Sequence, residues 1–152
     1  MDRYRRITNS AQETLRLGKI LGKCLPRGSV VLLFGDYGVG KTEFVRGIVQ
    51  GYLGDALAQD VASPSFTLLH VYGSEPRRIC HYDFYRLVDN KDVYQEVFRD
   101  TEEDDVICVE WPDKMTPPRF RETVRVDIKT LTSIQREVSI YASPFLLISF
   151  KE

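Results

Sequence analysis

The sequence lacks a long hydrophobic segment, an apolar leader and any paired cysteine motif. The longest aliphatic and aromatic runs, residues 30–34 and 145–148, are far shorter than the roughly 20 residues of a membrane-spanning helix. The N-terminal segment is polar, unlike a secretory signal peptide. The cysteines, Cys24, Cys80 and Cys108, show no C-x-x-C spacing, so we expect reduced core residues rather than metal ligands or redox groups. These absences predict a cytoplasmic protein with no membrane partner.

The chain also lacks an excess of charge of one sign. Lysine and arginine total 21 and aspartate and glutamate total 22, which gives a formal net charge of -1. Such a balance creates no field that attracts nucleic acid, so a role in RNA chemistry would need a partner to supply most of the binding surface. Apolar residues make up 43% of the 152 residues. This is enough for a hydrophobic core, and we expect a single domain over residues 1–152.

Helix and strand patterns alternate in the first third of the chain. Ser10 and Glu13, three positions apart, form a capping box, and apolar residues at helical spacing follow them. Residues 30–34 form a continuous apolar run, which is typical of a strand buried on both faces. A glycine-rich turn separates this strand from a second amphipathic helix, which we expect to end at Gly54.

The rest of the chain shows mainly strand patterns. We expect strands over residues 66–72, 78–84, 106–109, 124–128, 138–142 and 145–150, and a short helix over residues 92–98. The acidic residues between positions 100 and 105 are expected to form a solvated surface loop. The C-terminal third should therefore add antiparallel strands to a mixed sheet.

Residues 35–42 match the phosphate-binding pattern G-x-x-x-x-G-K-[ST] at every fixed position, between the expected strand and helix. Glycines let the backbone curl so that successive N–H groups face phosphate oxygens, and the helix N-terminus adds partial positive charge. Lys41 would neutralise the outer phosphates, and Thr42 would offer its hydroxyl to Mg²⁺. The fold class expected is α/β, a P-loop NTPase-like three-layer sandwich with a mixed sheet and C-terminal antiparallel strands.

Two acids could serve this phosphate loop, because a carboxylate at the end of a neighbouring strand usually supports the metal. Asp83 follows residues 79–82, and Glu110 follows the wholly apolar residues 106–109. The cleaner apolar run favours Glu110 on the metal side, which leaves Asp83 to orient or activate water. Alone, an acid at a strand end could simply face solvent.

Three other residues near these acids have competing interpretations. His81 lies among strand residues, which favours a hydrogen-bonded packing role over catalysis. Arg86 could approach the phosphates or pair with an acid. Trp111 could pack against the site, against a partner or into the core.

The sequence favours ATP over GTP. Guanine-binding proteins usually carry N-K-x-D, whereas valine ends the corresponding stretch at residues 90–93. The D-x-x-G pattern near the γ-phosphate is also incomplete, because residues 83–86 end in arginine.

Taken together, these motifs resemble one known family. L-F-G-D-Y-G-V-G-K-T at residues 33–42 is followed by S-P-S-F-T-L at 63–68, H-Y-D-F-Y-R-L at 81–87 and V-E-W-P at 109–112. In order and spacing they are similar to the TsaE (YjeE) family of bacterial ATPases in tRNA threonylcarbamoyladenosine biosynthesis. The resemblance covers nearly the whole chain.

The resemblance implies a role for each matching position. The phosphates would be held by Asp36, Tyr37, Gly38, Val39, Gly40, Lys41 and Thr42. Thr42 and Glu110 would bind Mg²⁺, and Asp83 would be the catalytic acid, with Lys41 and Glu110 as the other catalytic candidates. Residues 63–67 would form a switch-like loop near the γ-phosphate.

The resemblance also implies contacts to the rest of the nucleotide and a set of partners. Ala11, at the start of the capped helix, would lie near the base, and Arg136 would match a family arginine near the nucleotide. Family members support the threonylcarbamoyl transferase TsaD and its partner TsaB, and meet tRNA only through that complex. They bind ATP and hydrolyse it slowly alone.

Two other functions stay open at this point. The same loop could serve a small-metabolite or nucleoside kinase, with Arg119, Arg121 and Arg125 as part of a phosphate-gripping lid. The chain could also be a non-hydrolysing adaptor that changes shape when ATP binds. A short chain without an obvious substrate domain favours a nucleotide switch over a complete phosphotransferase.

Overall fold

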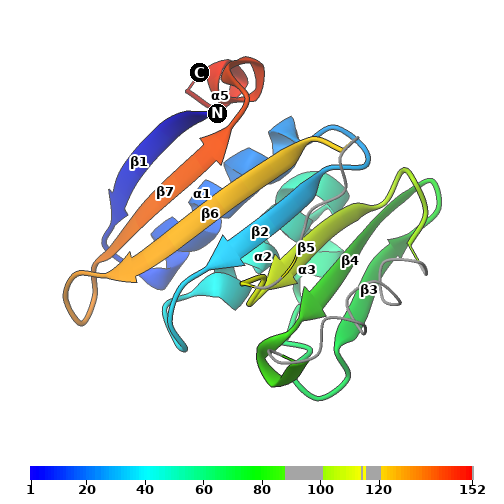
Figure 1. Ribbon diagram of the computed structural model, residues 1–152, viewed down its shortest axis with the longest axis horizontal. Helices are drawn as coiled ribbons and strands as arrows, with labels where there is room; N and C mark the ends of the chain where they lie inside the picture. Colours follow the sequence, from blue (N-terminus) through cyan, green and yellow to red (C-terminus); the bar gives the residue numbers. More distant parts are fainter. Residues whose placement is uncertain (88–100, 114, 116–120, 152) are drawn as a thin grey trace.

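A computed structural model describes residues 1–87, 101–113, 115 and 121–151. Its strands form one seven-stranded sheet in the order β1-β7-β6-β2-β5-β4-β3 (Figure 1). The strands are β1 (Asp2–Thr8), β2 (Val30–Phe34), β3 (Leu69–Ser74), β4 (Arg77–Asp83), β5 (Val106–Glu110), β6 (Thr123–Thr130) and β7 (Arg136–Ala142). The two ends of the chain lie close together beside the β1 edge (Figure 1).

The sheet is mixed, which confirms the expected α/β class. Its centre is parallel, because β2 pairs in parallel with β5 and β6, and β4 pairs in parallel with β5. The β1–β7, β6–β7 and β3–β4 pairs are antiparallel. The strands with continuous apolar runs, β2 and β5, therefore lie inside the sheet, where both of their faces are covered.

Helices α1 (Ala11–Cys24) and α2 (Lys41–Leu53) cover one face of the sheet, with the short α3 (Asp55–Ala58) following α2 (Figure 1). Their buried side chains and those of the sheet form the main core, with Leu21, Phe44 and Ile48 fully buried. At the α1 start the Ser10 hydroxyl accepts from the Glu13 N–H at 3.1 Å, as in the predicted capping box, but the Glu13 carboxylate accepts from the Asn9 N–H instead of the Ser10 N–H. A smaller core, centred on Tyr82 and Ile107, lies on the opposite face.

Glycines make the contact between α1 and α2 unusually close. Gly18 and Gly22 on α1 face Gly47 and Gly51 on α2. A Cβ added at any of them would lie 2.0–2.4 Å from a backbone oxygen of the other helix. The backbones of the two helices therefore touch directly, and this sets the position of the α1 N-terminus over the glycine-rich loop.

The expected C-terminal strand over residues 145–150 is wrong, because Pro144–Lys151 forms the helix α5. Ser143 marks its start, since the Ser143 hydroxyl accepts from the Leu146 N–H at 3.3 Å and proline follows at the first helical position. Leu146, Leu147 and Phe150 are buried against the main core, while Phe145 is 85% exposed. This spacing is helical, whereas a strand would alternate.

Other boundaries also differ from the sequence predictions. The polar N-terminal segment forms the edge strand β1, which is stabilised by antiparallel pairing with β7 rather than by burial of apolar side chains. Strand β3 begins only at Leu69, because a turn bonds the Leu68 N–H to the Pro64 carbonyl at 2.7 Å. The helix expected over residues 92–98 lies outside the described residues.

The acidic stretch is not wholly a solvated loop. Asp105 is 3% exposed and accepts from both Nε and Nη2 of Arg78, at 2.7 and 3.0 Å. Burial raises the pKa of Asp105, but the hydrogen bonds from Arg78 and from the Glu102 N–H outweigh it, so the pKa is lowered overall. The carboxylate is thus a structural anchor at the start of β5.

Two of the three cysteines are core residues, as the sequence predicts, whereas Cys24 is only partly buried. Cys80 and Cys108 are buried, and all three thiols are free. Burial raises the pKa of Cys80 to about 12 and that of Cys108 still further. None of the helices in the described part of the chain has the length and apolar character needed to span a bilayer.

Candidate functional site

The glycine-rich loop leaves the carboxyl end of β2, at the centre of the sheet, and leads into α2. Gly40 is the residue before α2 and has φ 111°, a left-handed conformation that suits glycine. Gly35 has φ 154°, and a Cβ there would lie 2.7 Å from the Ile128 carbonyl oxygen on β6. No side chain caps the N-terminus of α2 among the described residues. Its first N–H groups and its partial positive charge are therefore directed at the loop.

Lys41 lies folded back within the loop. Its ammonium donates to the Gly35 carbonyl at 2.6 Å and lies 3.4 Å from the centre of the Trp111 ring. Burial lowers the pKa of Lys41, although the carboxylates of Glu110 and Asp83 act in the opposite direction. The nearby carboxylates do not fully offset the cost of burying this ammonium, so binding of an anion beside Lys41 would be favourable.

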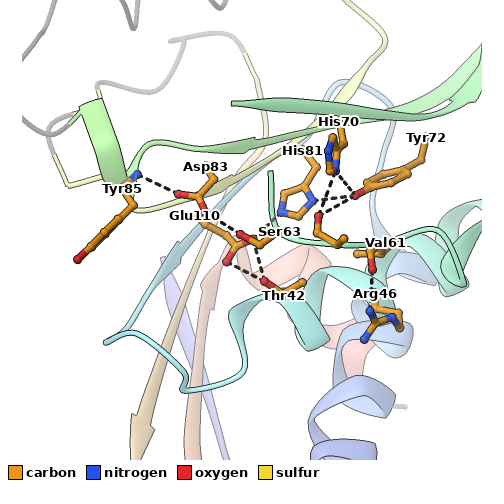
Figure 2. Close-up of polar contacts among 11 residues, drawn as sticks. Thr42, Arg46, Val61, Ser63, His70, Tyr72, His81, Asp83, Tyr85 and Glu110 are labelled. Carbon is orange, nitrogen blue, oxygen red and sulfur yellow. Dashed lines mark hydrogen bonds and ion pairs between the residues drawn. The ribbon is translucent and has the colours of Figure 1, made fainter. Parts of the chain in front are cut away.

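Thr42 and Glu110 meet across the loop and the end of β5. The Thr42 hydroxyl lies 3.1 and 3.2 Å from the two carboxylate oxygens of Glu110. Glu110 is 3% exposed. A hydroxyl and a carboxylate side by side are the hard oxygen ligands that Mg²⁺ prefers, and Figure 2 shows them facing each other.

Asp83 ends β4 in register with Glu110 at the end of the parallel strand β5. One of its carboxylate oxygens accepts from the Ser63 hydroxyl at 2.8 Å, and the other accepts from the Tyr85 N–H at 2.9 Å. Asp83 is therefore held by a strand, by the 63–67 segment and by the turn that follows β4 (Figure 2). A carboxylate oriented by two donors is suited to accepting a proton or a hydrogen bond from a water molecule.

Two adjoining cavities contain the site. One, of about 310 Å³, is lined by Lys41, Thr42, Asp83 and Glu110 together with Ser63, Tyr85 and Trp111. The other, of about 450 Å³, is lined by Ala11, Thr14 and Arg136 among others. Gly38, Gly40 and Glu43 line both cavities. The glycine-rich loop thus separates a carboxylate-lined end from an end formed by α1 and β7.

Comparison with known proteins gives the family. A family model described as "Threonylcarbamoyl adenosine biosynthesis protein TsaE" matches residues 8–138. The chain belongs to the TsaE family. It is 33% identical over 142 residues to the tRNA threonylcarbamoyladenosine biosynthesis protein TsaE of Rickettsia prowazekii, covering 91% of this chain and 94% of that protein. It is 34% identical over 135 residues to the TsaE of Treponema pallidum, covering 88% and 97%.

A solved structure agrees on the fold. The crystal structure of YdiB from Bacillus subtilis superimposes with a TM-score of 0.72 at 24% identity, covering 99% of this chain and 95% of that one. The TsaE match over residues 8–138 includes every residue that the sequence singled out for the site, from Ala11 to Arg136. Helix α5 lies beyond it.

The structure brings the predicted TsaE site residues together. Lys41, Thr42, Asp83 and Glu110 share one cavity, and Ala11 and Arg136 share the next. Arg136 also touches the glycine-rich loop directly, because its Nε donates to the Val39 carbonyl at 3.2 Å.

The aromatic residues in this region form a rim. Tyr37 is 85% exposed, with its ring centre 6.3 Å from that of Tyr85, which lies 4.9 Å from Trp111. Of the interpretations left open for Trp111, the structure supports two, because Trp111 lines the cavity and also packs against the smaller core. Arg86 lies over the Phe66 ring at 4.2 Å, within the 63–67 segment.

The residues considered for a kinase lid have other partners. Arg121 donates to the carbonyl oxygens of Asp105 and Glu102. Arg125 pairs with Asp127 at 2.9 Å and lies over the Phe34 ring. Arg119 lies outside the described residues. Arg121 and Arg125 therefore support the scaffold and line neither cavity.

Sequence reasoning did not predict which residue holds the Glu110 carboxylate in place. His81 was expected to be a hydrogen-bonded packing residue, and it is fully buried with hydrogen bonds. Its partner at Nε2, however, is Glu110, at 2.6 Å. The alternation of His81 and Asp83 along one strand would have indicated a shared face. Only the register against β5 shows that Glu110 is the neighbour of both.

Proposed function

We propose that this TsaE family member is a Mg²⁺-dependent ATP-binding protein and slow ATPase. It would support the transferase complex, TsaD with TsaB, that places threonylcarbamoyl on the adenosine next to the tRNA anticodon. The observation that carries the proposal is the meeting of Lys41, Thr42, Asp83 and Glu110 in one cavity at the carboxyl ends of parallel strands. In open α/β sheets, ligands bind at this edge.

The triphosphate would lie along residues 35–42, where the α2 N-terminus supplies unpaired N–H groups. Lys41 would leave the Gly35 carbonyl and move onto phosphate oxygens. Its burial, at 5% exposure, supports this step, because the anion would replace an incomplete set of partners around a charged group.

Thr42 and Glu110 fit Mg²⁺. Both are oxygen ligands, and they already lie within 3.2 Å of each other. Within the described residues no cluster of three or more His, Cys, Asp or Glu side chains could hold a metal ion alone. This suits Mg²⁺, which commonly uses one or two protein ligands and completes its shell with phosphates and water. When bound, the ion would neutralise charge on the phosphate oxygens.

Asp83 would orient the attacking water. Its two carboxylate oxygens are held by Ser63 and by the Tyr85 N–H, which fixes the direction of the remaining lone pairs. The nucleoside would occupy the second cavity, between Ala11 and Arg136. The net charge of -1 supports a protein that reaches tRNA through its complex rather than by its own surface.

Binding is tested first. Calorimetry with ATP and Mg²⁺ should give heat for the wild type and for Lys23→Ala, which removes an exposed lysine on α1, and none for Lys41→Ala. Excess GTP should displace ATP poorly. A folded wild-type protein that gives no heat with ATP and Mg²⁺ would refute the proposal.

Turnover is tested second, with and without TsaD and TsaB. We expect slow hydrolysis by the chain alone, faster hydrolysis with the complex, and loss of the stimulated rate in Asp83→Ala. Unchanged stimulated turnover in both Asp83→Ala and Lys41→Ala would contradict the ATPase. If Asp83→Asn binds ATP and still replaces the wild type in a deletion strain, the chain is an adaptor instead. Transfer of phosphate to a small-molecule acceptor would identify a kinase.

A further inference from the structure

A buried histidine contacts Glu110, and a buried tyrosine contacts that histidine in turn (Figure 2). His81, on β4, is 0% exposed, and Tyr72, on β3, is 5% exposed. Nε2 of His81 is 2.6 Å from a carboxylate oxygen of Glu110, and Nδ1 is 3.1 Å from the Tyr72 hydroxyl. The hydrogen-bonded series runs from Thr42 through Glu110 and His81 to Tyr72, across three strands and the start of α2.

The chemistry of these groups fixes the direction of each hydrogen bond. An ionised carboxylate only accepts, so Nε2 of His81 carries the hydrogen that Glu110 receives. In the neutral ring Nδ1 then accepts, and the Tyr72 hydroxyl donates to it. Burial raises the pKa of Tyr72 to about 12, so its hydroxyl keeps its proton at neutral pH.

This arrangement restrains a side chain that would otherwise be free to turn. Glutamate has three rotatable bonds, and Thr42 approaches both of its carboxylate oxygens almost equally, at 3.1 and 3.2 Å. Thr42 therefore does not select one oxygen. His81 does, because it bonds to only one of the two. The other oxygen keeps the Thr42 hydroxyl as its partner, at 3.1 Å.

Strand β3, which carries Tyr72, also contacts the segment that holds Asp83. Nδ1 of His70, on β3, donates to the Ala62 carbonyl oxygen at 3.1 Å and lies 3.5 Å from the Tyr72 hydroxyl. The next residue, Ser63, donates to Asp83. The preceding carbonyl, that of Val61, accepts from Arg46 on α2 at 2.6 Å. Three consecutive residues are thus bonded to α2, to β3 and to Asp83 at the end of β4.

We propose that His81, supported by Tyr72, is a positioning residue that holds the Glu110 carboxylate toward Thr42. The inference deepens the proposed function, because it concerns the carboxylate assigned there to the magnesium side. An alternative is a histidine that only satisfies core hydrogen bonds. The positioning role predicts that loss of the Nε2 contact alone weakens Mg²⁺-dependent ATP binding, and the packing role predicts that it does not.

Two matched variants separate the contacts of the ring. In His81→Gln the side-chain amide reaches about as far as Nε2 and still donates to Glu110. In His81→Asn the shorter amide reaches only about as far as Nδ1, so it keeps a partner in Tyr72 and loses Glu110. Tyr72→Phe removes the hydroxyl and keeps the buried ring. Thermal unfolding measures how much stability each variant loses.

The readout is the Mg²⁺ concentration that half-saturates ATP binding. Loss of an outer partner of a metal ligand commonly costs about 10–100-fold in metal affinity. We expect His81→Asn to raise the half-saturating concentration by about that factor, and His81→Gln to raise it by less than about 3-fold. Tyr72→Phe should fall between them. If the two His81 variants shift it equally, or not at all, the positioning role is refuted and packing alone remains.

A second readout needs neither metal nor ATP. Nitrogen-detected NMR of the metal-free wild type should show a hydrogen on Nε2 of His81, and the resonance of that hydrogen should move upfield in Glu110→Ala, because its acceptor is removed. A ring protonated only on Nδ1 would overturn the inference, because it could not donate to Glu110. If calorimetry shows no magnesium-dependent ATP binding, the proposed function fails, and this spectrum still decides the His81–Glu110 contact on its own.

Discussion

Replacing Gly47 by alanine tests how closely α1 and α2 are packed. A Cβ at this position would lie 2.0 Å from the Leu15 carbonyl oxygen and 2.8 Å from the Lys19 nitrogen. Ordinary contact begins at 3.4 Å, so the helices would have to separate by about 1.4 Å. Both clashing atoms are backbone, so no side chain can rotate to relieve them.

The expected loss of stability follows from two opposing effects. Overpacking of a rigid core costs about 3 kcal/mol at the upper end of its usual range. Alanine in the middle of a helix returns about 1 kcal/mol relative to glycine. The net loss is about 2 kcal/mol, which lowers the Tm by about 4–8 °C for a chain of this size. Urea unfolding with an unchanged slope would measure it directly.

The substitution should also weaken ATP binding, because α1 forms one wall of the second cavity through Ala11 and Thr14. Gly54→Ala is the matched control. Its Cβ would meet nothing within 4 Å, although φ is 110°. It should lose about 1–2 kcal/mol through backbone strain alone and keep the ATP affinity of the wild type. If Gly47→Ala is as stable as the wild type or more so, the close helix contact is wrong.

Three further predictions concern the scaffold. Asp105→Asn should cost about 2 kcal/mol at pH 7, because Arg78 loses a buried partner but is itself partly solvated. Since the pKa of Asp105 is lowered in the folded protein, its contribution is complete above the unfolded value near 4 and is lost as pH falls through the folded value. Urea unfolding at several pH values should show the two proteins converging in acid, and a constant difference would contradict the ion pair. Leu147→Ala should cost about 2–4 kcal/mol and Phe145→Ala under about 0.5 kcal/mol, because Leu147 is buried and Phe145 is exposed; equal losses would instead indicate a strand. A thiol reagent at pH 8 should label only Cys24 in the native protein and all three cysteines after unfolding, and rapid native labelling of Cys80 or Cys108 would show that the sheet opens.

The central elements could be predicted from the sequence because their local patterns agree with their tertiary surroundings. Residues 30–34 are apolar throughout and form β2, which is covered on both faces. The Ser10 capping box and the helix behind it are equally local features. Glycines of the phosphate loop have few alternative explanations once a strand precedes them and a helix follows.

The errors arise where a short pattern depends on distant partners. Residues 145–150 have high β-propensity, but Ser143 and Pro144 start a helix whose buried face is set by the core. β1 is polar and is fixed only by pairing with β7. The close glycine contacts between α1 and α2 could not be predicted, because the sequence does not show which faces of the two helices pack together.

The arrangement of the site follows from strand register more than from any single motif. Asp83 pairs with Glu110, and His81 pairs with Cys108, in adjacent parallel strands. Side chains two residues apart on a strand share a face, so His81, Asp83 and Glu110 all project toward the side covered by α2. A slip of one residue between β4 and β5 would turn these groups to the opposite face. The apolar residues preceding each acid therefore do more than fill the core, because their packing fixes the register that brings two carboxylates and their histidine support to the loop at Thr42.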